Sequence, residues 1–218
     1  KEIHAENVRR AARGRRLKVK VGAEVDWFVY DGWEEEFAAF RKESGLDYYI
    51  SGNHFLQPSE GEILDIKDLS LLAGPEREKA LKNHFAAICR AIESGVFAFI
   101  AHVDYIRKSE FCPDEAFWQE KMKVVDCLEK CKTATELSSK GLRKRGDFYP
   151  ADKLIREIVR RQIPLVVSDD AHRTGELGFE FAKSEEYLRN LIVAAAGSFN
   201  FFAVFVRIFT VQTGFTRS

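Results

Sequence analysis

The sequence predicts an α/β protein with a largely parallel sheet, either open or closed into a barrel. Short apolar runs alternate along the chain with segments of helical periodicity, which is typical of strand–helix–strand units. The 218 residues are enough for one domain with a substantial core. Neither an internal repeat nor a linker-like stretch divides the chain, so we expect a single domain over residues 1–218.

Each expected element follows from a local signal in the sequence. Strands are expected where apolar or alternating runs occur, at 17–25, 47–51, 96–101, 133–137, 164–167 and 199–211. Helices are expected where apolar residues recur at helical spacing, at 2–16, 32–44, 75–93, 114–130, 151–161 and 179–196. The polar segment 52–74 and the basic segment 141–149 are expected to be loops.

Composition narrows the possible partners. The chain has 34 basic and 34 acidic residues and no charged tail, so we expect no nucleic-acid partner. The apolar stretch 191–209 is interrupted by Ser198, Asn200 and Arg207, so we expect a helix and a core strand there and no membrane partner. The spacing of the four cysteines matches no zinc or redox motif, and we expect small buried thiols in a protein of the cytoplasm. The oligomeric state stays open.

Acidic residues and histidines follow several expected strands, at the point where each strand ends. One such stretch, VVSDDAHRTGELG at 166–178, carries two aspartates and a histidine directly after an apolar run. A lone histidine or glutamate after a strand has an ordinary structural explanation, but the carboxyl ends of parallel strands meet at one edge. The residues expected to converge there are Glu24, His54, His102, Glu136, Asp170 and His172.

A divalent metal ion would explain this convergence, because burying unpaired carboxylates and imidazoles is costly. Mixed histidine and carboxylate ligands suit zinc, manganese or iron rather than calcium. Such ions, especially in pairs, serve the hydrolysis of phosphate esters, since they lower the pKa of a water molecule and offset charge in the transition state. The sequence contains no G-x-S-x-G elbow, P-loop or dinucleotide-binding fingerprint, which argues against those other chemistries.

Five motifs together resemble a known superfamily. They are GAEVDW at 22–27, SGNHF at 51–55, AHVDYIRK at 101–108, TELSSKGLRKRGDFYP at 135–150 and SDDAHRTGELG at 168–178. In order and spacing they resemble the polymerase and histidinol phosphatase (PHP) superfamily, histidinol-phosphate phosphatase branch, over about residues 1–188. The resemblance implies a distorted seven-stranded β/α barrel with two or three divalent ions (Zn, Mn or Fe) at its mouth. The implied reaction, part of histidine biosynthesis, is hydrolysis of a small-molecule phosphate ester, L-histidinol phosphate, to L-histidinol and phosphate.

The resemblance also assigns roles to residues. It implies that the metal ligands are Glu24, His54, His102, Asp170 and His172. Asp104, in the H-x-D pattern, and Glu136, an acidic residue near the site, are the implied catalytic residues beside the metal. The implied phosphate-binding residues are Arg143, Lys144 and Arg173.

The sequence departs from the family pattern in two places. The family opens with a strand carrying H-x-H, which is absent here, and Ser138 stands where the family usually has Asn. We therefore expect a barrel that lacks its first one or two strands, either because the sequence is a fragment or because the protein is truncated, and we expect weak metal binding. Two alternatives stay open: another phosphoesterase of the superfamily, acting on nucleotides, and a catalytically inactive remnant of the fold.

Overall fold

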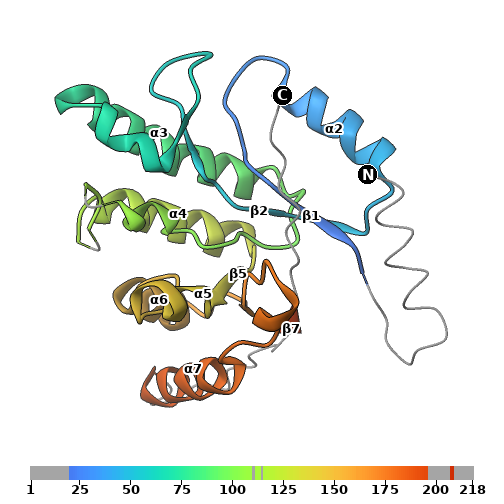
Figure 1. Ribbon diagram of the computed structural model, residues 1–218, viewed down its shortest axis with the longest axis vertical. Coiled ribbons are helices and arrows are strands. Elements are labelled where there is room, and N and C mark those ends of the chain that lie inside the picture. The colour runs from blue at the N-terminus through green and yellow to red at the C-terminus, as the bar shows by residue number, and fades with distance from the viewer. Residues whose placement is uncertain (1–19, 110, 114, 196–206, 209–218) are drawn as a thin grey trace.

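A curved parallel sheet organises the computed structural model, which describes residues 20–109, 111–113, 115–195 and 207–208 (Figure 1). The strands are β1 (Gly22–Val25), β2 (Tyr48–Ser51), β3 (Phe55–Leu56), β4 (Leu64–Asp65), β5 (Thr135–Ser138), β6 (Leu165–Ser168) and β7 (Arg207–Ile208). The α-helices are α2 (Trp33–Ser44), α3 (Gly74–Glu93), α4 (Trp118–Cys131), α5 (Lys140–Arg145), α6 (Asp152–Arg160) and α7 (Phe181–Ala195). Short 3₁₀ helices are η1 (Ile66–Leu71), η2 (Tyr105–Lys108) and η3 (Thr174–Glu176).

The sheet is parallel, as the alternation of elements predicts. β1 pairs with β2, and β5 pairs with β6, which pairs with β7. Ile100 joins the two halves, because it bridges to Ser51 on one side and to Thr135 on the other. The strand predicted at 96–101 is shorter in the structure: Ile100 forms the two bridges, and the backbone N–H groups of Ala98 and Ala101 donate to the Tyr49 and Ser51 carbonyls of β2. The positive φ of 24° at His102 ends the extended backbone just after this bridge.

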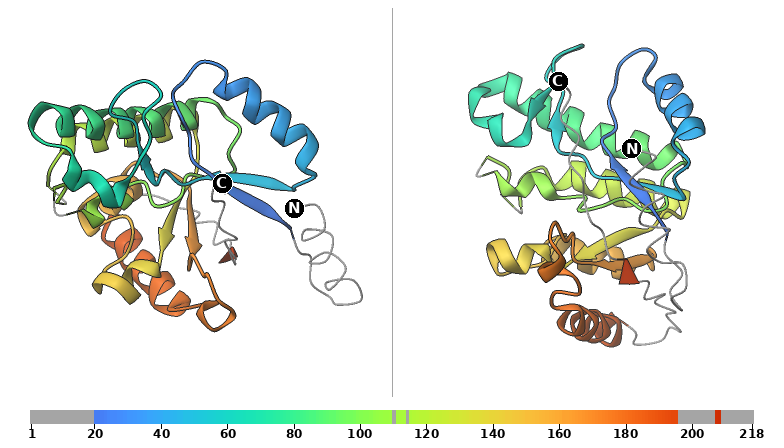
Figure 2. Two further views of the ribbon diagram at one scale, coloured as in Figure 1. Left: turned by 45° about the horizontal axis from the view of Figure 1, so that its top comes forward. Right: turned by 45° about the vertical axis from the view of Figure 1, so that its right-hand side comes forward.

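The helices cover one face of the sheet. α3, α4, α6 and α7 lie in a row, each in contact with the next, and the views in Figures 1 and 2 agree on this arrangement. The main apolar core fills the space between this row and the sheet. A smaller apolar cluster on the opposite face consists of Ile50, Phe99, Ala101 and Val166. Strands that are apolar on both faces are typical of parallel sheets and barrels.

The segment 52–74 was predicted to be a surface loop, and that prediction was wrong. It contains the antiparallel hairpin of β3 and β4, followed by η1. Leu56, Ile66, Leu69 and Leu72 are buried in the main core, and β3 contacts α3. The leucines and isoleucines of this segment lie at irregular spacing between polar residues, so neither a helical nor a strand period is visible in the sequence.

The segment 141–149 was also predicted to be a loop, but its first part belongs to helix α5. Leu, Arg and Lys are good helix formers, and Gly146, with a φ of 75°, follows the helix as its left-handed cap. The loop was predicted because the segment is short and rich in basic residues, which is typical of a solvated loop. The helix matters because it carries four basic side chains, Lys140, Arg143, Lys144 and Arg145, at the carboxyl edge of β5.

The other predicted elements are found with changed ends, where the structure describes them. Helix α4 begins at Trp118, later than predicted, after Phe117 in a left-handed conformation. The predicted helix at 2–16 lies outside the described residues, as does the predicted strand 199–211 apart from β7. Among the described helices, none is both long and apolar enough to span a membrane. The single-domain organisation stays a prediction.

Candidate metal centre

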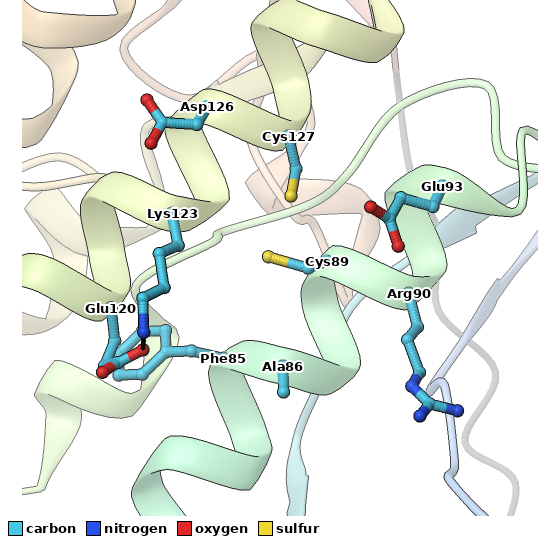
Figure 3. Close-up of a pocket in the computed structure, with 9 residues that line it drawn as sticks. All are labelled: Phe85, Ala86, Cys89, Arg90, Glu93, Glu120, Lys123, Asp126 and Cys127. Atoms are coloured by element: carbon cyan, nitrogen blue, oxygen red, sulfur yellow. Dashed lines mark hydrogen bonds and ion pairs between the residues drawn. The ribbon is translucent and has the colours of Figure 1, made fainter.

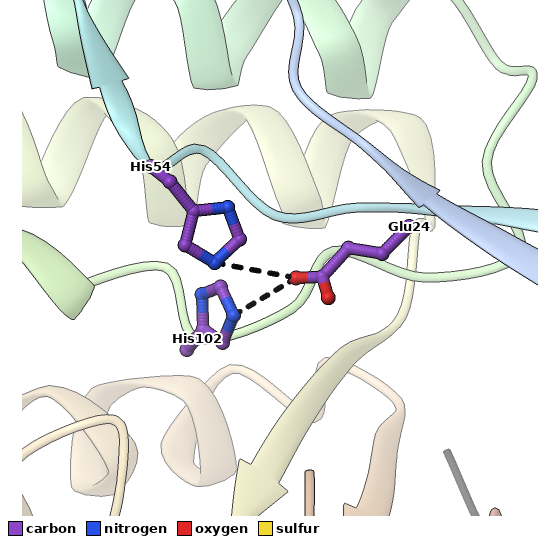
Figure 4. Close-up of side chains that lie close together, drawn as sticks. All are labelled: Glu24, His54 and His102. Carbon is purple, nitrogen blue, oxygen red and sulfur yellow. Dashed lines mark ion pairs between the residues drawn. The ribbon is translucent and has the colours of Figure 1, made fainter. Parts of the chain in front are cut away.

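Glu24, His54 and His102 meet at the carboxyl edge of the sheet, as predicted (Figure 4). Their ligand atoms all lie within 4.8 Å of one another. The Glu24 Oε1 atom is 3.0 Å from His102 Nε2 and 3.6 Å from His54 Nε2. Glu24 comes from β1, His54 from the segment after β2, and His102 from the turn after Ile100. Three neighbouring positions of one parallel sheet therefore deliver one cluster.

The cluster has the chemistry of a transition-metal site. Two imidazoles and one carboxylate are a donor set that zinc, manganese and iron accept. The side chain of His102 is only 2% exposed, its Nε2 atom faces Glu24, and its Nδ1 atom has no hydrogen-bond partner among the described residues. A divalent ion would use an imidazole nitrogen and the Glu24 carboxylate at once. These residues therefore fit a bound metal ion.

The electrostatics of the cluster point the same way. Burial alone would raise the pKa of Glu24, but the His102 contact and the charges of His102, His54 and Lys140 lower it to about 2. Burial alone would lower the pKa of His102, but Glu24 outweighs it and raises this pKa to about 10. In the metal-free protein an imidazolium thus balances the carboxylate. Glu24 therefore favours a positive charge beside it, and a divalent ion would take the place of that proton.

Asp26 orients His54 and was not singled out as a site residue from the sequence. The His54 backbone N–H donates to Asp26 Oδ1, and the His54 Nδ1 atom lies 3.3 Å from Asp26 Oδ2. This arrangement turns Nε2 of the same ring toward Glu24. A signal for it was present: Glu24 and Asp26 are two residues apart in extended backbone and so share a face.

Glu136 lies beneath the cluster and supports His102. Its Oε1 atom accepts the His102 backbone N–H at 2.8 Å, and its Oε2 atom accepts the Ser168 hydroxyl at 2.6 Å. Burial, only partly offset by His102, raises the pKa of Glu136 to about 7. His102 has the unfavourable φ noted above, and such strain persists only when surrounding contacts hold it. The predicted catalytic role of Glu136 stays a prediction, and what we observe is a positioning contact.

Asp104 is buried, and its observed contacts brace the chain. Its Oδ2 atom accepts the Ala151 backbone N–H at 2.7 Å and lies 3.2 Å from Arg107 Nε. The buried Arg107 side chain also donates to the carbonyl of Phe148. These contacts tie the turn after Ile100 to the start of α6. The predicted catalytic role of Asp104 is not tested by them.

Asp170 and His172 lie together after β6, but a lysine rather than the first cluster is their immediate partner. Lys140 Nζ is 2.5 Å from Asp170 Oδ2 and 2.9 Å from His172 Nε2. Neither residue belongs to the group formed by Glu24, His54 and His102 within the described chain. Lys140 was missed from the sequence because it opens a basic segment that resembles solvated surface.

The three predicted phosphate-binding residues lie in different surroundings. Arg143 donates to the Asp169 carbonyl at 2.7 Å and pairs with Glu176 at 3.4 Å, so its guanidinium holds the loop after β6. Lys144 and Arg173 are exposed near the same edge of the sheet. Phosphate binding by these residues stays a prediction.

A second concave region lies between α3 and α4, and it does not carry the predicted chemistry (Figure 3). Cys89 and Cys127 face each other there, and burial raises the pKa of both thiols. Raised pKa values disfavour the nucleophilic thiolate. Of the four thiols predicted to be buried, Cys112 is buried and Cys89 and Cys127 are partly buried, whereas the prediction was wrong for Cys131, which is exposed.

Two curated relatives resemble the chain in sequence. A protein of Deinococcus radiodurans, named probable histidinol-phosphatase, is 28% identical over 184 residues, covering 81% of this chain and 66% of that protein. A histidinol-phosphatase of Bacillus subtilis is 24% identical over 183 residues, covering 76% of this chain and 67% of that protein. The chain thus spans about two thirds of the length of these relatives. No protein-family model matches it.

Two solved structures share the fold. A candidate histidinol phosphatase from Listeria monocytogenes superposes with a TM-score of 0.65 at 19% identity, over 84% of this chain and 74% of that one. Histidinol phosphate phosphatase from Lactococcus lactis, solved with zinc, L-histidinol and phosphate, gives a TM-score of 0.58 at 13% identity, over 95% and 74%. The fold is that of the distorted α/β barrels of these neighbours, as predicted.

Proposed function

We propose that the chain is a metal-dependent phosphomonoesterase of the PHP superfamily that hydrolyses L-histidinol phosphate to L-histidinol and phosphate. The observation that carries this proposal is the convergence of Glu24, His54 and His102 at the carboxyl edge of the sheet. The similarity to two histidinol-phosphatases supports the substrate, and the Lactococcus lactis neighbour was solved with zinc and both reaction products. Such a role in amino-acid biosynthesis would place the protein in the cytoplasm.

Some residues of the site would bind the ion, and others position those ligands. Glu24, His54 and His102 would hold a zinc, manganese or iron ion, which when bound supplies Lewis acidity and lowers the pKa of a water molecule. Asp26 fixes the ring of His54, and Glu136 fixes the backbone of His102. Both contacts preorganise the ligands, so less free energy is lost in ordering them when the ion binds.

The charged rim suits an anionic substrate. Lys144 and Arg173 are exposed and therefore accessible to a phosphate group, which their charged donors suit. Arg143 would contribute indirectly to phosphate binding, because it donates to the Asp169 carbonyl and so positions the loop after β6. The apolar and aromatic side of the site includes Tyr105, whose ring centroid lies 5.1 Å from His54 and 4.9 Å from His102.

The test is phosphate release by the metal-loaded chain from L-histidinol phosphate and, in parallel, from nucleoside 5′-monophosphates. Glu24→Gln should lower both bound metal and turnover by about 100-fold or more, because it removes a charged ligand. Glu60→Gln, an exposed glutamate outside the cluster, is the matched control and should leave both unchanged. Faster release from nucleotides would shift the proposal to another phosphoesterase of the superfamily. Tight metal binding without release from any ester would favour an inactive remnant.

A further inference from the structure

Sheet register brings Lys140 beside Asp170. β5 and β6 pair with Ser138 opposite Ser168, and the Ser139 N–H continues this pairing by donating to the Ser168 carbonyl at 2.9 Å. Lys140 and Asp170 each lie two residues beyond the Ser138–Ser168 pair, so both leave the sheet at the same edge. Their proximity therefore follows from the sheet itself and not from a chance surface contact.

The Lys140 ammonium lies where a cation is needed. It is 2.5 Å from Asp170 Oδ2 and 2.9 Å from His172 Nε2, while the same imidazole nitrogen is 3.1 Å from Asp170 Oδ1. The side chains of Lys140 and Asp170 are only 17% and 8% exposed. An ammonium group can only donate hydrogen bonds, so His172 Nε2 must accept with its lone pair. A metal ion at this position would need that same lone pair.

The loop that carries Asp170 and His172 is held by contacts that do not involve Lys140. The His172 backbone N–H donates to Glu176 Oε2 at 2.9 Å, and Arg143 pairs with Glu176 and donates to the Asp169 carbonyl. Asp170 has a φ of 44°, a strained conformation that such bracing can maintain. Removing the lysine side chain would leave the carboxylate and the imidazole in place but without a cation between them.

We propose that the Lys140 ammonium fills the cation position between Asp170 and His172, so that the chain binds its divalent ion at Glu24, His54 and His102 alone. This inference rests on the metal site of the proposed function and adds that the second position is taken by a fixed positive charge. A phosphoryl group at the site would then meet one ion and one ammonium rather than two ions. Lys140 thus sets the number of ions that the site accepts.

The test counts manganese bound to the full chain by equilibrium dialysis and elemental analysis. Manganese is chosen because carboxylates and imidazoles suit it better than thiols do. The wild-type chain should bind about one ion and Lys140→Ala about two, since loss of the ammonium leaves a carboxylate and an imidazole lone pair open. Asp170→Asn added to Lys140→Ala should return the count to one. Lys130→Ala, which removes an exposed lysine of α4, is the matched control and should bind as the wild type does.

The outcomes separate this inference from the proposed function. A folded Lys140→Ala variant that still binds one ion overturns the inference and leaves the first metal site standing. Two ions on the wild-type chain overturn it as well. No ion on the wild-type chain overturns the metal site and the inference together. If Lys140→Ala fails to fold, Asp170→Asn in the wild-type background decides: an unchanged ion count supports the role of Lys140, and a lost ion contradicts it.

Discussion

Gly52 offers the sharpest mutational test of the metal centre. It follows β2, and its backbone passes directly beside the Glu24 carboxylate. A Cβ atom at Gly52 would lie 1.8 Å from Glu24 Oε1 and 2.8 Å from His102 Cε1. Real Cβ contacts below 3.0 Å are essentially never seen, so Gly52→Ala must displace the carboxylate oxygen by about 1.2 Å or more, the difference between 3.0 and 1.8 Å.

That displacement is large on the scale of metal coordination. Ligand distances are tolerated within about 0.2 Å of their ordinary values, so Glu24 could no longer complete the site. We expect Gly52→Ala to weaken metal binding by about 100-fold or more. The variant also separates Glu24 from His102, and breaking a buried pair costs at most about 3–5 kcal/mol of unfolding free energy. The actual loss should be smaller, because the carboxylate can move without being removed.

Calorimetric titration of the metal-free chain with Zn²⁺, together with thermal unfolding, measures both effects. Gly175→Ala is the control, because an added Cβ there meets nothing within 4 Å and the backbone does not require glycine. The control should bind zinc and unfold as the wild type does. If Gly52→Ala bound zinc within about twofold of the wild type, the close approach of Gly52 to Glu24 would be refuted, since about 100-fold is expected.

Two further predictions concern the residues that support the ligands. Asp26→Asn should weaken metal binding by about 10–100-fold in a chelator competition, because the amide orients His54 less firmly; exposed Asp31→Asn is the control, and equal affinities would count against the role of Asp26. Burial raises the pKa of Glu136 from 4.5 to about 7, so ionising this carboxyl destabilises the metal-free fold progressively as pH rises between these values. Glu136→Gln has no such loss. The difference in unfolding free energy between this variant and the wild type should therefore rise, in favour of the variant, by on the order of 3 kcal/mol from pH 4.5 to pH 8. Denaturant unfolding across this range measures the gain, and a difference that does not change with pH would contradict it.

The main layout and the convergence of Glu24, His54 and His102 could be predicted from the sequence for a simple reason. Short strands alternate with helices, and parallel strands place their carboxyl ends at one edge. Glu24, His54 and His102 each follow or end a strand segment, so the topology alone brings them together. This convergence is observed although the strand before His102 is shorter than predicted, with its bridges at Ile100.

The missed features depend on contacts that local sequence patterns do not encode. The β3–β4 hairpin is buried because β3, with Leu56, packs against α3. The sequence of that segment has no periodicity that would predict this packing. In the sequence Lys140 is one of several charges in a basic segment. Its contact with Asp170 follows from the register of β5 and β6, which the local sequence does not specify. The need for glycine at position 52 arises from the side chain of Glu24 in another strand.

X-ray absorption at the zinc edge of the zinc-loaded chain tests the central claim most directly, because it identifies the atoms bound to the ion. A site made by Glu24, His54 and His102 predicts nitrogen and oxygen neighbours at about 2.0–2.2 Å, with the outer-shell scattering of two imidazoles. The imidazole signal should fall by half in His54→Ala. Sulfur neighbours at about 2.3 Å would place the ion on thiols such as Cys89 and Cys127 and would contradict the account.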